Sequence, residues 1–338
     1  MFYQPDFVQF IMNGGLGDVI MALPVLRYAI CNDFGDQFRV SCPPEYDFLV
    51  KDWINSKYIH NFFNKVVWPG RVSMMRVTKD HSMTPRTNIT LYASMNMLGK
   101  LIPVEHRSLP RWQSLNLFYE NDMQAWMGLE KSLEGVDLSK SVILPVSFRS
   151  HAKKWNQKCL IEFVEYLKSQ NLTPICVGGS VAKDSKLIAP NFLTKSISFP
   201  EGAVDLVGRI SVKQTLALMQ RSLAVVGVTG GLIQLAGLTD RPIVCLSTYT
   251  DLFHSLFWRD GEFAKGVYPV VPPENKCAFC VNDFIVNYLD YNECLLGKNF
   301  ECTEFEFSQV KAAFEKVASG KPCDLQISLN QSIIRDFG

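Results

Sequence analysis

Residues 7–30 read FVQFIMNGGLGDVIMALPVLRYAI, an apolar strand-like run, a glycine-rich turn and a second apolar run of helical length. A tight turn between a strand and a helix needs one glycine at a position with positive φ. Three glycines stand here, Gly14, Gly15 and Gly17, which indicates that the backbone approaches a ligand closely. Asp18 opens the predicted helix, either as a carboxylate favoured by the helix dipole or as a catalytic group at the edge of that ligand site.

Strand-like and helix-like segments alternate through both halves of the chain. In the first half, strands are predicted at 7–12, 37–42 and 88–92. In the second half, strands are predicted at 141–148, 173–179, 223–228 and 242–247, and helices at 157–171, 212–222, 231–238 and within 304–319. Such alternation is typical of α/β proteins with parallel sheets.

The two alternations predict two Rossmann-like domains, residues 1–140 and 141–320, followed by a C-terminal tail at 321–338. Ligands of open parallel sheets bind beyond the carboxyl ends of the strands. Both glycine-rich turns of this sequence lie at such ends. We therefore expect an α/β fold of two Rossmann-like domains whose parallel sheets face one interdomain cleft.

Composition limits the class of protein. The 338 residues exceed the size at which single hydrophobic cores usually stop growing, which favours two domains. Lys and Arg number 34 against 33 Asp and Glu, so the net charge of +1 lacks the basic excess typical of nucleic-acid binders. No apolar run approaches the roughly 18 residues of a membrane span, and no secretory signal opens the sequence. A cytoplasmic protein is expected.

A second glycine-rich turn follows the predicted strand at 223–228. Thr229, Gly230 and Gly231 lead from this strand into a helix, where small residues expose backbone N–H groups at the positive helix end. Such a turn is suited to a phosphate group. Many strand-to-helix turns contain glycine without any ligand, so this motif by itself leaves both interpretations open.

A basic segment follows the strand at 141–148. It contains Ser147, Arg149, His151, Lys153 and Lys154, placing four potential cations within six residues. Cations at the carboxyl end of a strand suit a diphosphate group. The alternative is a solvated basic loop, which is common in proteins.

Together these segments resemble glycosyltransferase family 9, the ADP-heptose–lipopolysaccharide heptosyltransferases, which have the two-domain GT-B fold. The resemblance covers roughly residues 7–250, and the glycine-rich turn is also similar to the nucleotide-sugar loop of glycogen synthases. The matching positions are Gly17-Asp18-Val19, Leu23-Pro24, Lys153 with Trp155, Gly178-Gly179, and the turn and helix from Thr229 to Pro242.

The resemblance implies metal-independent transfer of a sugar from a nucleotide-diphosphate sugar with inversion at the anomeric carbon. Asp18 matches the general base that takes the proton of the acceptor hydroxyl. Lys153 matches a group that stabilises the departing diphosphate, assisted by Lys154 or Arg149. Asp205 matches an acidic position near the nucleotide ribose, although an exposed loop carboxylate is an equal alternative. The donor-binding set also includes Gly15, Gly17, Ser147, Gly178, Gly179, Thr229, Gly230, Gly231 and Gln234.

Three positions in the second turn depart from the family pattern. Thr229 stands where the family has Asp, Gly230 where it has Thr or Ser, and Gln234 where it has His. Those family residues contact the nucleotide sugar, so the donor could differ from ADP-heptose. A catalytically inactive, nucleotide-binding relative is a further alternative.

In GT-B enzymes the acceptor is selected by the N-terminal domain, and here the candidate segment is a basic loop at 69–86. Its basic residues suit the phosphates of a cell-surface saccharide such as a lipopolysaccharide core, or a DNA backbone. Some bacteriophage enzymes of this fold glycosylate modified cytosines, and the net charge near zero favours the saccharide. The residues concerned are Arg71, Arg76, Lys79, His81 and Arg86.

Ten cysteines occur, of which Cys277, Cys280, Cys294 and Cys302 form the pattern C-x2-C-x13-C-x7-C. The first pair has the spacing of a zinc knuckle, whereas the second pair is wider than usual. A structural zinc, disulfide pairing and unbonded thiols all remain open, and no catalytic metal is expected. The other six cysteines are scattered, several in apolar runs, and are expected to behave as small buried hydrophobes.

Overall fold

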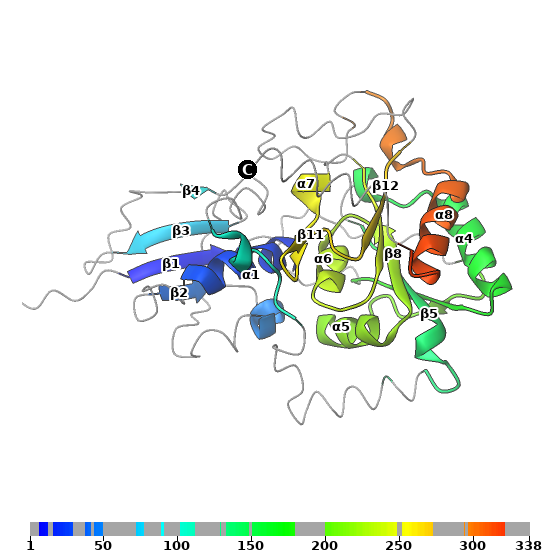
Figure 1. Ribbon diagram of the computed structural model, residues 1–338, viewed down its shortest axis with the longest axis horizontal. Helices are drawn as coiled ribbons and strands as arrows, with labels where there is room; N and C mark the ends of the chain where they lie inside the picture. The colour runs from blue at the N-terminus through cyan, green and yellow to red at the C-terminus, as the bar shows by residue number, and fades with distance from the viewer. Residues whose placement is uncertain are drawn as a thin grey trace, which may run out of the picture. The chain divides into compact units, whose positions relative to one another are not determined.

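The computed structural model divides the chain into two compact units (Figure 1). One unit combines Met1–Leu117 with Phe257–Gly261, and the other combines Phe118–Leu256 with Glu262–Gly338. The structure divides the chain after residue 117, whereas the sequence predicts a boundary after residue 140. In addition, a short segment of the second half belongs to the first unit. The structure describes residues 7–12, 16–29, 38–41, 44–49, 72–77, 89–90, 102–111, 129, 133–148, 151–179, 200–248, 252–272, 294 and 297–321.

The first unit contains a sheet with the strand order β2-β1-β3-β4. Strand β1 (Phe7–Met12) runs parallel to β2 (Phe38–Ser41), as the sequence predicts. Strand β3 (Val72–Val77) runs antiparallel to both β1 and β4 (Ile89–Thr90). The described part of this sheet is therefore mixed, and the prediction of a purely parallel sheet is wrong for this unit.

Strand β3 also corrects the interpretation of residues 69–86 as a loop. Six of these residues, VSMMRV, form a strand in which Arg76 pairs with Val8 of β1. The valines that begin and end this run favour extended structure, and this preference outweighed the basic residues nearby.

Helix α1 (Leu16–Ala29) follows the glycine-rich turn, and its apolar side chains are buried. Every residue from Val19 to Pro24 is buried, and so is Leu26. Six consecutive buried residues span more than one full turn, so α1 is buried on all sides over this stretch and is stabilised by packing. A 3-10 helix, η2 (Pro44–Leu49), follows β2.

Residues 102–111 of the first unit pack against the segment that returns from the second half of the chain. Ser108 forms a parallel bridge with Trp258, and its Oγ accepts a hydrogen bond of 2.7 Å from the Gly261 amide. The guanidinium of Arg111 forms an ion pair with Asp260. Asp260 and Gly261 have φ values of 51° and 80°, as the Asp-Gly sequence of a two-residue turn favours.

The second unit contains a six-stranded sheet in which all neighbouring strands are parallel. Its order is β12-β9-β8-β5-β6-β7. The predicted strands and helices of this half are confirmed, and β7 and β12 add two strands. The strands are β5 (Ser141–Pro145), β6 (Thr173–Val177), β7 (Val204–Asp205), β8 (Ala224–Val228), β9 (Ile243–Leu246) and β12 (Val267–Val270). The short β11 (Glu262–Phe263) lies outside this sheet, and the short β10 (Trp258–Arg259) belongs to the segment assigned to the first unit.

Helices cover both faces of this sheet. Helices α4 and α8 contact each other, and α8 contacts β9 and β12 (Figure 1). Helices α5 and α6 contact each other, and α6 contacts β8 and β9. The helices of this unit are α4 (Gln157–Ser169), α5 (Val212–Arg221), α6 (Gly231–Gly237), α7 (Leu252–Ser255) and α8 (Phe307–Ala318), with 3-10 helices η6 (Leu138–Lys140), η7 (His151–Lys153) and η8 (Glu301–Thr303). The 3-10 helix η4 (Val104–His106) belongs to the first unit.

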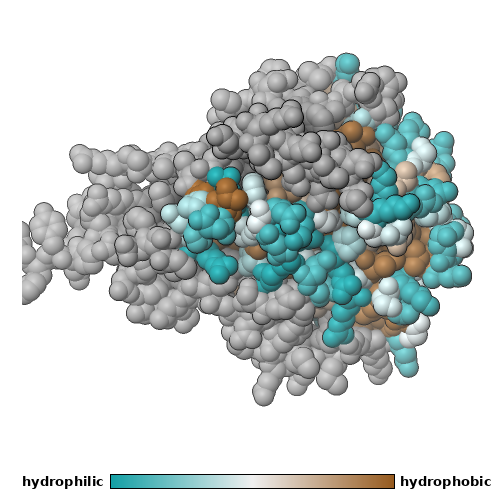
Figure 2. Space-filling view, in the orientation of Figure 1, coloured by the Kyte–Doolittle hydropathy of each residue, from teal (hydrophilic) through white to brown (hydrophobic). Residues whose placement is uncertain are grey.

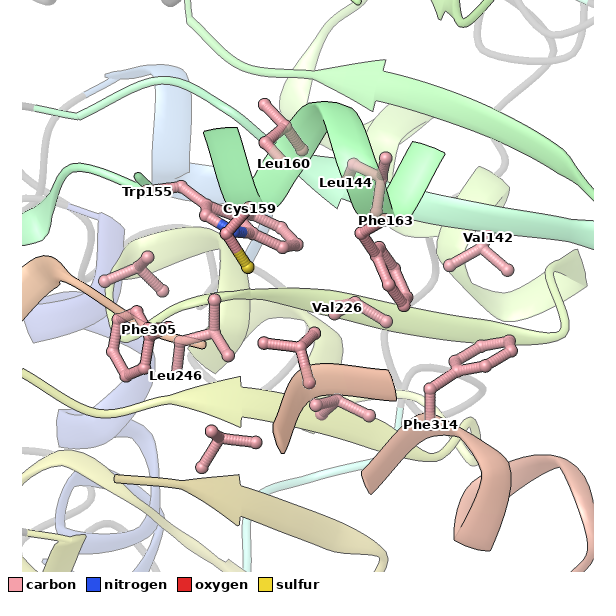
Figure 3. Close-up of a cluster of buried hydrophobic side chains, with 14 of the residues drawn as sticks. Val142, Leu144, Trp155, Cys159, Leu160, Phe163, Val226, Leu246, Phe305 and Phe314 are labelled. Atoms are coloured by element: carbon pink, nitrogen blue, oxygen red, sulfur yellow. The ribbon is translucent and has the colours of Figure 1, made fainter. Parts of the chain in front are cut away.

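Aliphatic and aromatic side chains together fill the core between the sheet and the α4–α8 pair (Figure 3). Phe163 and Phe314 lie edge to face, with ring centroids 5.5 Å apart, and Trp155 is 1% exposed. Truncating a buried phenylalanine to alanine typically destabilises a protein by about 3–5 kcal/mol. This core fixes the positions of the loops that leave the carboxyl ends of β5 and β8.

Three of the scattered cysteines are free thiols in the core of the second unit. Cys159, Cys176 and Cys245 are buried, which confirms that they behave as small hydrophobic residues. Burial raises the pKa of Cys159 to about 11 and that of Cys176 to about 12, because a buried thiolate loses its hydration. These thiols are therefore protonated at neutral pH.

Among the helices within the described residues, none is both long and apolar enough to cross a membrane. On the face of the molecule that Figure 2 shows, hydrophilic residues predominate over the described surface, with smaller hydrophobic areas between them. Isolated apolar areas of this kind are ordinary for a folded protein.

Candidate functional site

The candidate site lies at the point where the strand order of the second sheet reverses direction. Counted along the chain within this sheet, its strands lie in the order 6-5-4-1-2-3, so the switch lies between β5 and β8. This is the order of dinucleotide-binding sheets, in which ligands bind beyond the carboxyl ends of the strands at the switch. The turn Thr229–Gly231 follows β8, and the basic segment follows β5. Both predicted phosphate-binding segments therefore leave the two strands that flank the switch.

The turn after β8 presents two backbone amides. The Thr229 N–H already donates to the Leu246 carbonyl at 2.9 Å, so this amide is not available to a phosphate, contrary to the prediction. The amides of Gly230 and Gly231 have no backbone acceptor outside α6 within the described residues. Gly230 has an extended φ of 168°, and a Cβ atom there would meet only the Val228 carbonyl oxygen, at 3.8 Å. Neither the backbone conformation nor packing requires glycine at this position, and its absent side chain leaves the amide open.

The loops after β5 and β6 are joined by a hydrogen bond. The Gly179 N–H donates to Ser147 Oγ at 3.2 Å. A Cβ atom at Gly178 would lie 2.5 Å from the same oxygen, so glycine is sterically required at residue 178. A Cβ at Gly179 would meet nothing within 4 Å. Ser147 therefore fixes this pair of loops, and open space lies next to Gly179.

Asp205 ends β7, which is separated from the switch strand β5 by β6. Its Oδ1 accepts a hydrogen bond of 2.9 Å from the Val207 N–H, and its Oδ2 lies 3.2 Å from Arg209 Nη2. Through these contacts the Asp205 carboxylate stabilises the loop that follows β7. The contact with a nucleotide ribose stays a prediction.

The basic segment after β5 is anchored to the protein interior. Lys153 ends the 3-10 helix η7, in which Ala152 is buried, and Trp155 is buried two residues further on. Lys153 and Lys154 are themselves partly exposed. The two lysines thus extend from a fixed turn, which suits a binding role better than a solvated loop does. Arg149 lies outside the described residues.

Two buried polar side chains of the second unit, one on α6 and one after β9, have an unpaired oxygen, and the sequence pointed to only the first of them. Gln234 lies on α6, and its Nε2 donates to the Ser255 carbonyl at 3.1 Å. Thr248, which was not predicted as a site residue, follows β9 and is fully buried. Gln234 Oε1 and Thr248 Oγ1 are both buried with no hydrogen-bond partner in the part of the chain that the structure describes. Leaving a buried polar atom unpaired costs about 1–3 kcal/mol.

In the other half of the predicted site, the structure places Gly17, Asp18 and Arg76 in their helix and strand. Gly17 and Asp18 lie in the first turn of α1, and Arg76 lies on β3. The Asp18 side chain lies outside the described part, so its two interpretations stay predictions. The same holds for Gly15, Arg71, Lys79, His81 and Arg86.

Two of the four clustered cysteines lie in the described part of the chain. Cys302 is buried in η8, and Cys294 is partly exposed. Among the described residues, no three His, Cys, Asp or Glu side chains converge as metal ligands would. Cys277 and Cys280 lie outside these residues, so the metal site stays a prediction.

Comparison with known proteins confirms the resemblance and the fold class. Residues 119–259 match the model of glycosyltransferase family 9 (heptosyltransferase). The structure resembles TibC, the bacterial iron-containing dodecameric glycosyltransferase of enterotoxigenic E. coli H10407, with a TM-score of 0.62 and 18% identity over 92% of this chain and 75% of TibC. It also resembles the family 9 glycosyl transferase of Veillonella parvula DSM 2008, with a TM-score of 0.51 and 12% identity over 91% of this chain and 95% of that one.

A second TibC structure is a complex with ADP-D-beta-D-heptose. There, 53% of this chain aligns with 45% of TibC at 23% identity and a TM-score of 0.43. No curated protein matches this chain in sequence. The chain thus shares the α/β fold of these glycosyltransferases, which is the GT-B fold.

Proposed function

Because residues 119–259 match glycosyltransferase family 9, we propose that this chain transfers a sugar from a nucleotide-diphosphate sugar to an acceptor hydroxyl. The observation that carries the proposal is the pair of open amides at Gly230 and Gly231, beside the switch between β5 and β8. N–H groups without an acceptor, in a turn that follows the carboxyl end of a parallel strand, are suited to the oxygens of a phosphate. In this proposal the second unit binds the donor.

The proposed reaction breaks the bond between the anomeric carbon and the diphosphate oxygen, and forms a bond to the acceptor oxygen with inversion. Asp18 accepts the proton of the acceptor hydroxyl as that oxygen attacks. Negative charge grows on the departing diphosphate, and Lys153 stabilises this charge together with the amides of Gly230 and Gly231. Lys154 is close in sequence to Lys153 and assists it. The reaction itself involves no change in oxidation state.

ADP-D-beta-D-heptose is the first donor to test, because TibC, whose fold this chain shares, has been crystallised with it. Thr229, Gly230 and Gln234 differ from the family pattern at the turn after β8, and these differences favour testing other nucleotide sugars beside it. The proposed acceptor is a cell-surface saccharide that contacts the basic residues around β3, including Arg76. DNA with a modified cytosine is the alternative acceptor.

We further propose that Cys277, Cys280, Cys294 and Cys302 bind one structural metal ion. Four thiolates are a suitable donor set for zinc or iron, and TibC is described as iron-containing. The burial of Cys302 fits a ligand held in a low-dielectric site. In this proposal the metal stabilises the segment around η8, and the donor's diphosphate is bound by Lys153 and the amides of the turn after β8.

The proposal is tested first by binding, then by turnover. Thermal unfolding of the full chain is measured with ADP, UDP, GDP and CMP and with their sugars. A ligand at 100 times its dissociation constant stabilises a protein by about 2.7 kcal/mol, which is readily measured. Two results together support the proposal. The protein is stabilised by nucleotides of one base, and it releases the nucleotide diphosphate from the corresponding nucleotide sugar when a saccharide or DNA acceptor is present. Binding without hydrolysis or transfer indicates an inactive relative, and no binding contradicts the proposal.

A further inference from the structure

Two arginines within residues 102–111 of the first unit differ in the groups that their guanidiniums contact. Arg111 donates from both Nε and Nη2 to the carboxylate oxygens of Asp260. Arg107 instead donates from Nε to the Ile102 carbonyl at 3.0 Å. Its terminal nitrogens, Nη1 and Nη2, have no acceptor in the part of the chain that the structure describes. The fork that these two nitrogens form is therefore available to an anion.

The guanidinium of Arg107 is fixed on two sides. Its Cζ atom lies 5.5 Å from the centroid of the Trp258 ring, within the distance at which a cation is attracted to an aromatic ring. Trp258 is itself fixed, because its carbonyl accepts the Leu109 N–H at 2.9 Å. The hydrogen bond from Nε to Ile102 fixes the edge of the same guanidinium. A guanidinium that is already oriented loses little conformational entropy when an anion binds.

The charge of Arg107 is not neutralised by its acidic neighbour on η4. Glu105 is exposed, and among the described residues no carboxylate forms an ion pair with Arg107. Partial burial lowers the pKa of Arg107, and the Glu105 carboxylate opposes this shift, so the guanidinium stays charged at neutral pH. A positive charge that has lost part of its hydration interacts more strongly with an anion than a fully solvated charge does.

This fork is separate from the proposed site of sugar transfer. Helix α1 contacts η4, where His106 stacks on Tyr28 with ring centroids 5.0 Å apart. Tyr28 lies ten residues after Asp18 on α1, which corresponds to about 15 Å along the helix. The segment that carries Arg107 thus packs near the end of α1 that is remote from the glycine-rich turn. A ligand bound there is distinct from the hydroxyl that Asp18 would deprotonate.

We propose that Arg107, oriented by Trp258 and the Ile102 carbonyl, binds one carboxylate or phosphate group of a ligand through Nη1 and Nη2. Two oxygens of either group match the spacing of the guanidinium fork. The site suits a single anionic group rather than a nucleic-acid backbone, because the exposed Glu105 would repel a continuous row of phosphates. This inference is independent of the proposed function, since it concerns another part of the first unit.

Nuclear magnetic resonance of the full chain, labelled with 15N-arginine, tests the inference. The Nε–H groups of Arg107 and Arg111 both form hydrogen bonds, so both signals are protected from rapid exchange with water. Arg111 is the matched control, because its fork is occupied by Asp260. The signals missing from Arg107→Lys and from Arg111→Lys identify the two residues. The wild-type chain is titrated with sodium phosphate and, separately, with sodium acetate, at an ionic strength kept constant with sodium chloride.

The Arg107 signal is expected to shift to a saturating value with at least one of the two anions, while the Arg111 signal moves little. The anion with the lower dissociation constant identifies the preferred group. Glu105→Gln should tighten this binding about two- to fivefold, because it removes a repelling charge, whereas Glu134→Gln, at an exposed glutamate of the second unit, should not. Equal and unsaturated shifts of both arginine signals would overturn the inference. An unchanged affinity in Glu105→Gln would contradict the placement of the anion at Arg107.

Discussion

The ring of His151 lies 5.8 Å from the ring of Phe300. His151 begins η7, the turn that ends with Lys153, and Phe300 immediately precedes η8, which contains Cys302. Phe300 has a φ of 61°, a left-handed conformation that is rare for a bulky residue. Strain of this kind persists only where the surrounding structure maintains it. The contact therefore links the cysteine-containing segment to the turn that holds the proposed phosphate-binding lysine.

Replacing Phe300 with glycine removes the contact between the rings of His151 and Phe300 without adding backbone strain. Phe300→Gly removes the ring, while glycine adopts the positive φ without strain. The affinity for ADP is expected to fall several-fold, because η7 loses a packing partner and Lys153 is held less firmly. The affinity for adenosine, which has no phosphate, should not change. Calorimetric titration with both ligands measures the difference, and an equal loss for both would contradict the link.

The predicted general base is tested with Asp18→Asn. The amide keeps the size of the side chain and cannot accept the proton, so transfer is expected to fall about 10²–10⁴-fold. Donor affinity, measured by calorimetry, should stay within about twofold of the wild-type value. Turnover at the wild-type rate would leave Asp18 with the role of a helix-end carboxylate only.

The leaving-group role of Lys153 is tested with Lys153→Ala. Both ADP affinity and the rate of transfer are expected to fall, because the lysine neutralises charge in the bound state and more strongly in the transition state. Lys158→Ala is the control, since Lys158 is an exposed lysine five residues further along the chain. The binding defect of Lys153→Ala should also shrink as ionic strength rises. Equal behaviour of the two variants would remove Lys153 from the site.

Metal content of the purified full chain tests the cysteine cluster. We expect about one zinc or iron ion per chain by atomic emission, because four thiolates complete a tetrahedral site. Cys302→Ser should lower the metal content and the Tm together, whereas Cys245→Ala, in β9, should leave the metal content unchanged. A wild-type chain without metal after expression in metal-supplemented medium would favour disulfides or free thiols.

The buried thiols predict how labelling and stability depend on pH. Because burial raises the pKa of Cys159 to about 11 and of Cys176 to about 12, both should resist alkylation at pH 8 unless the protein unfolds. Between pH 9 and 11 the unfolded chain loses these protons while the folded chain keeps them. The free energy of unfolding should therefore decrease as pH rises through this range. Rapid native labelling of either cysteine, identified by mass spectrometry, would contradict their burial.

Alternating sequence patterns were sufficient to predict the second sheet, except for its edges. Strand β7 has two residues, too few to produce a pattern. Strand β12 contains Pro269, which usually argues against a strand, but β12 lies at the edge of the sheet, where proline is tolerated. The antiparallel β3 was missed because Arg76 and its basic neighbours suggested a loop.

The sequence identifies the residues of the turn after β8, but it does not predict which of their backbone amides form hydrogen bonds within the protein. Glycine at 230 and 231 can be read from the sequence, but the occupied amide of Thr229 depends on the neighbouring strand β9. A sequence motif specifies which residues lie at a site, and tertiary packing determines which of their atoms remain available to bind a ligand.

Because Phe257–Gly261 belongs to the first unit, the two halves of the gene do not correspond to the two units of the structure. Cutting the gene near residue 117 would separate Ser108 and Arg111 from Trp258, Gly261 and Asp260, their partners within one unit. The first half expressed alone is therefore an incomplete folding unit. The same dependence restricts recombination, because a second half exchanged from a relative has to bring a compatible copy of this five-residue segment with it.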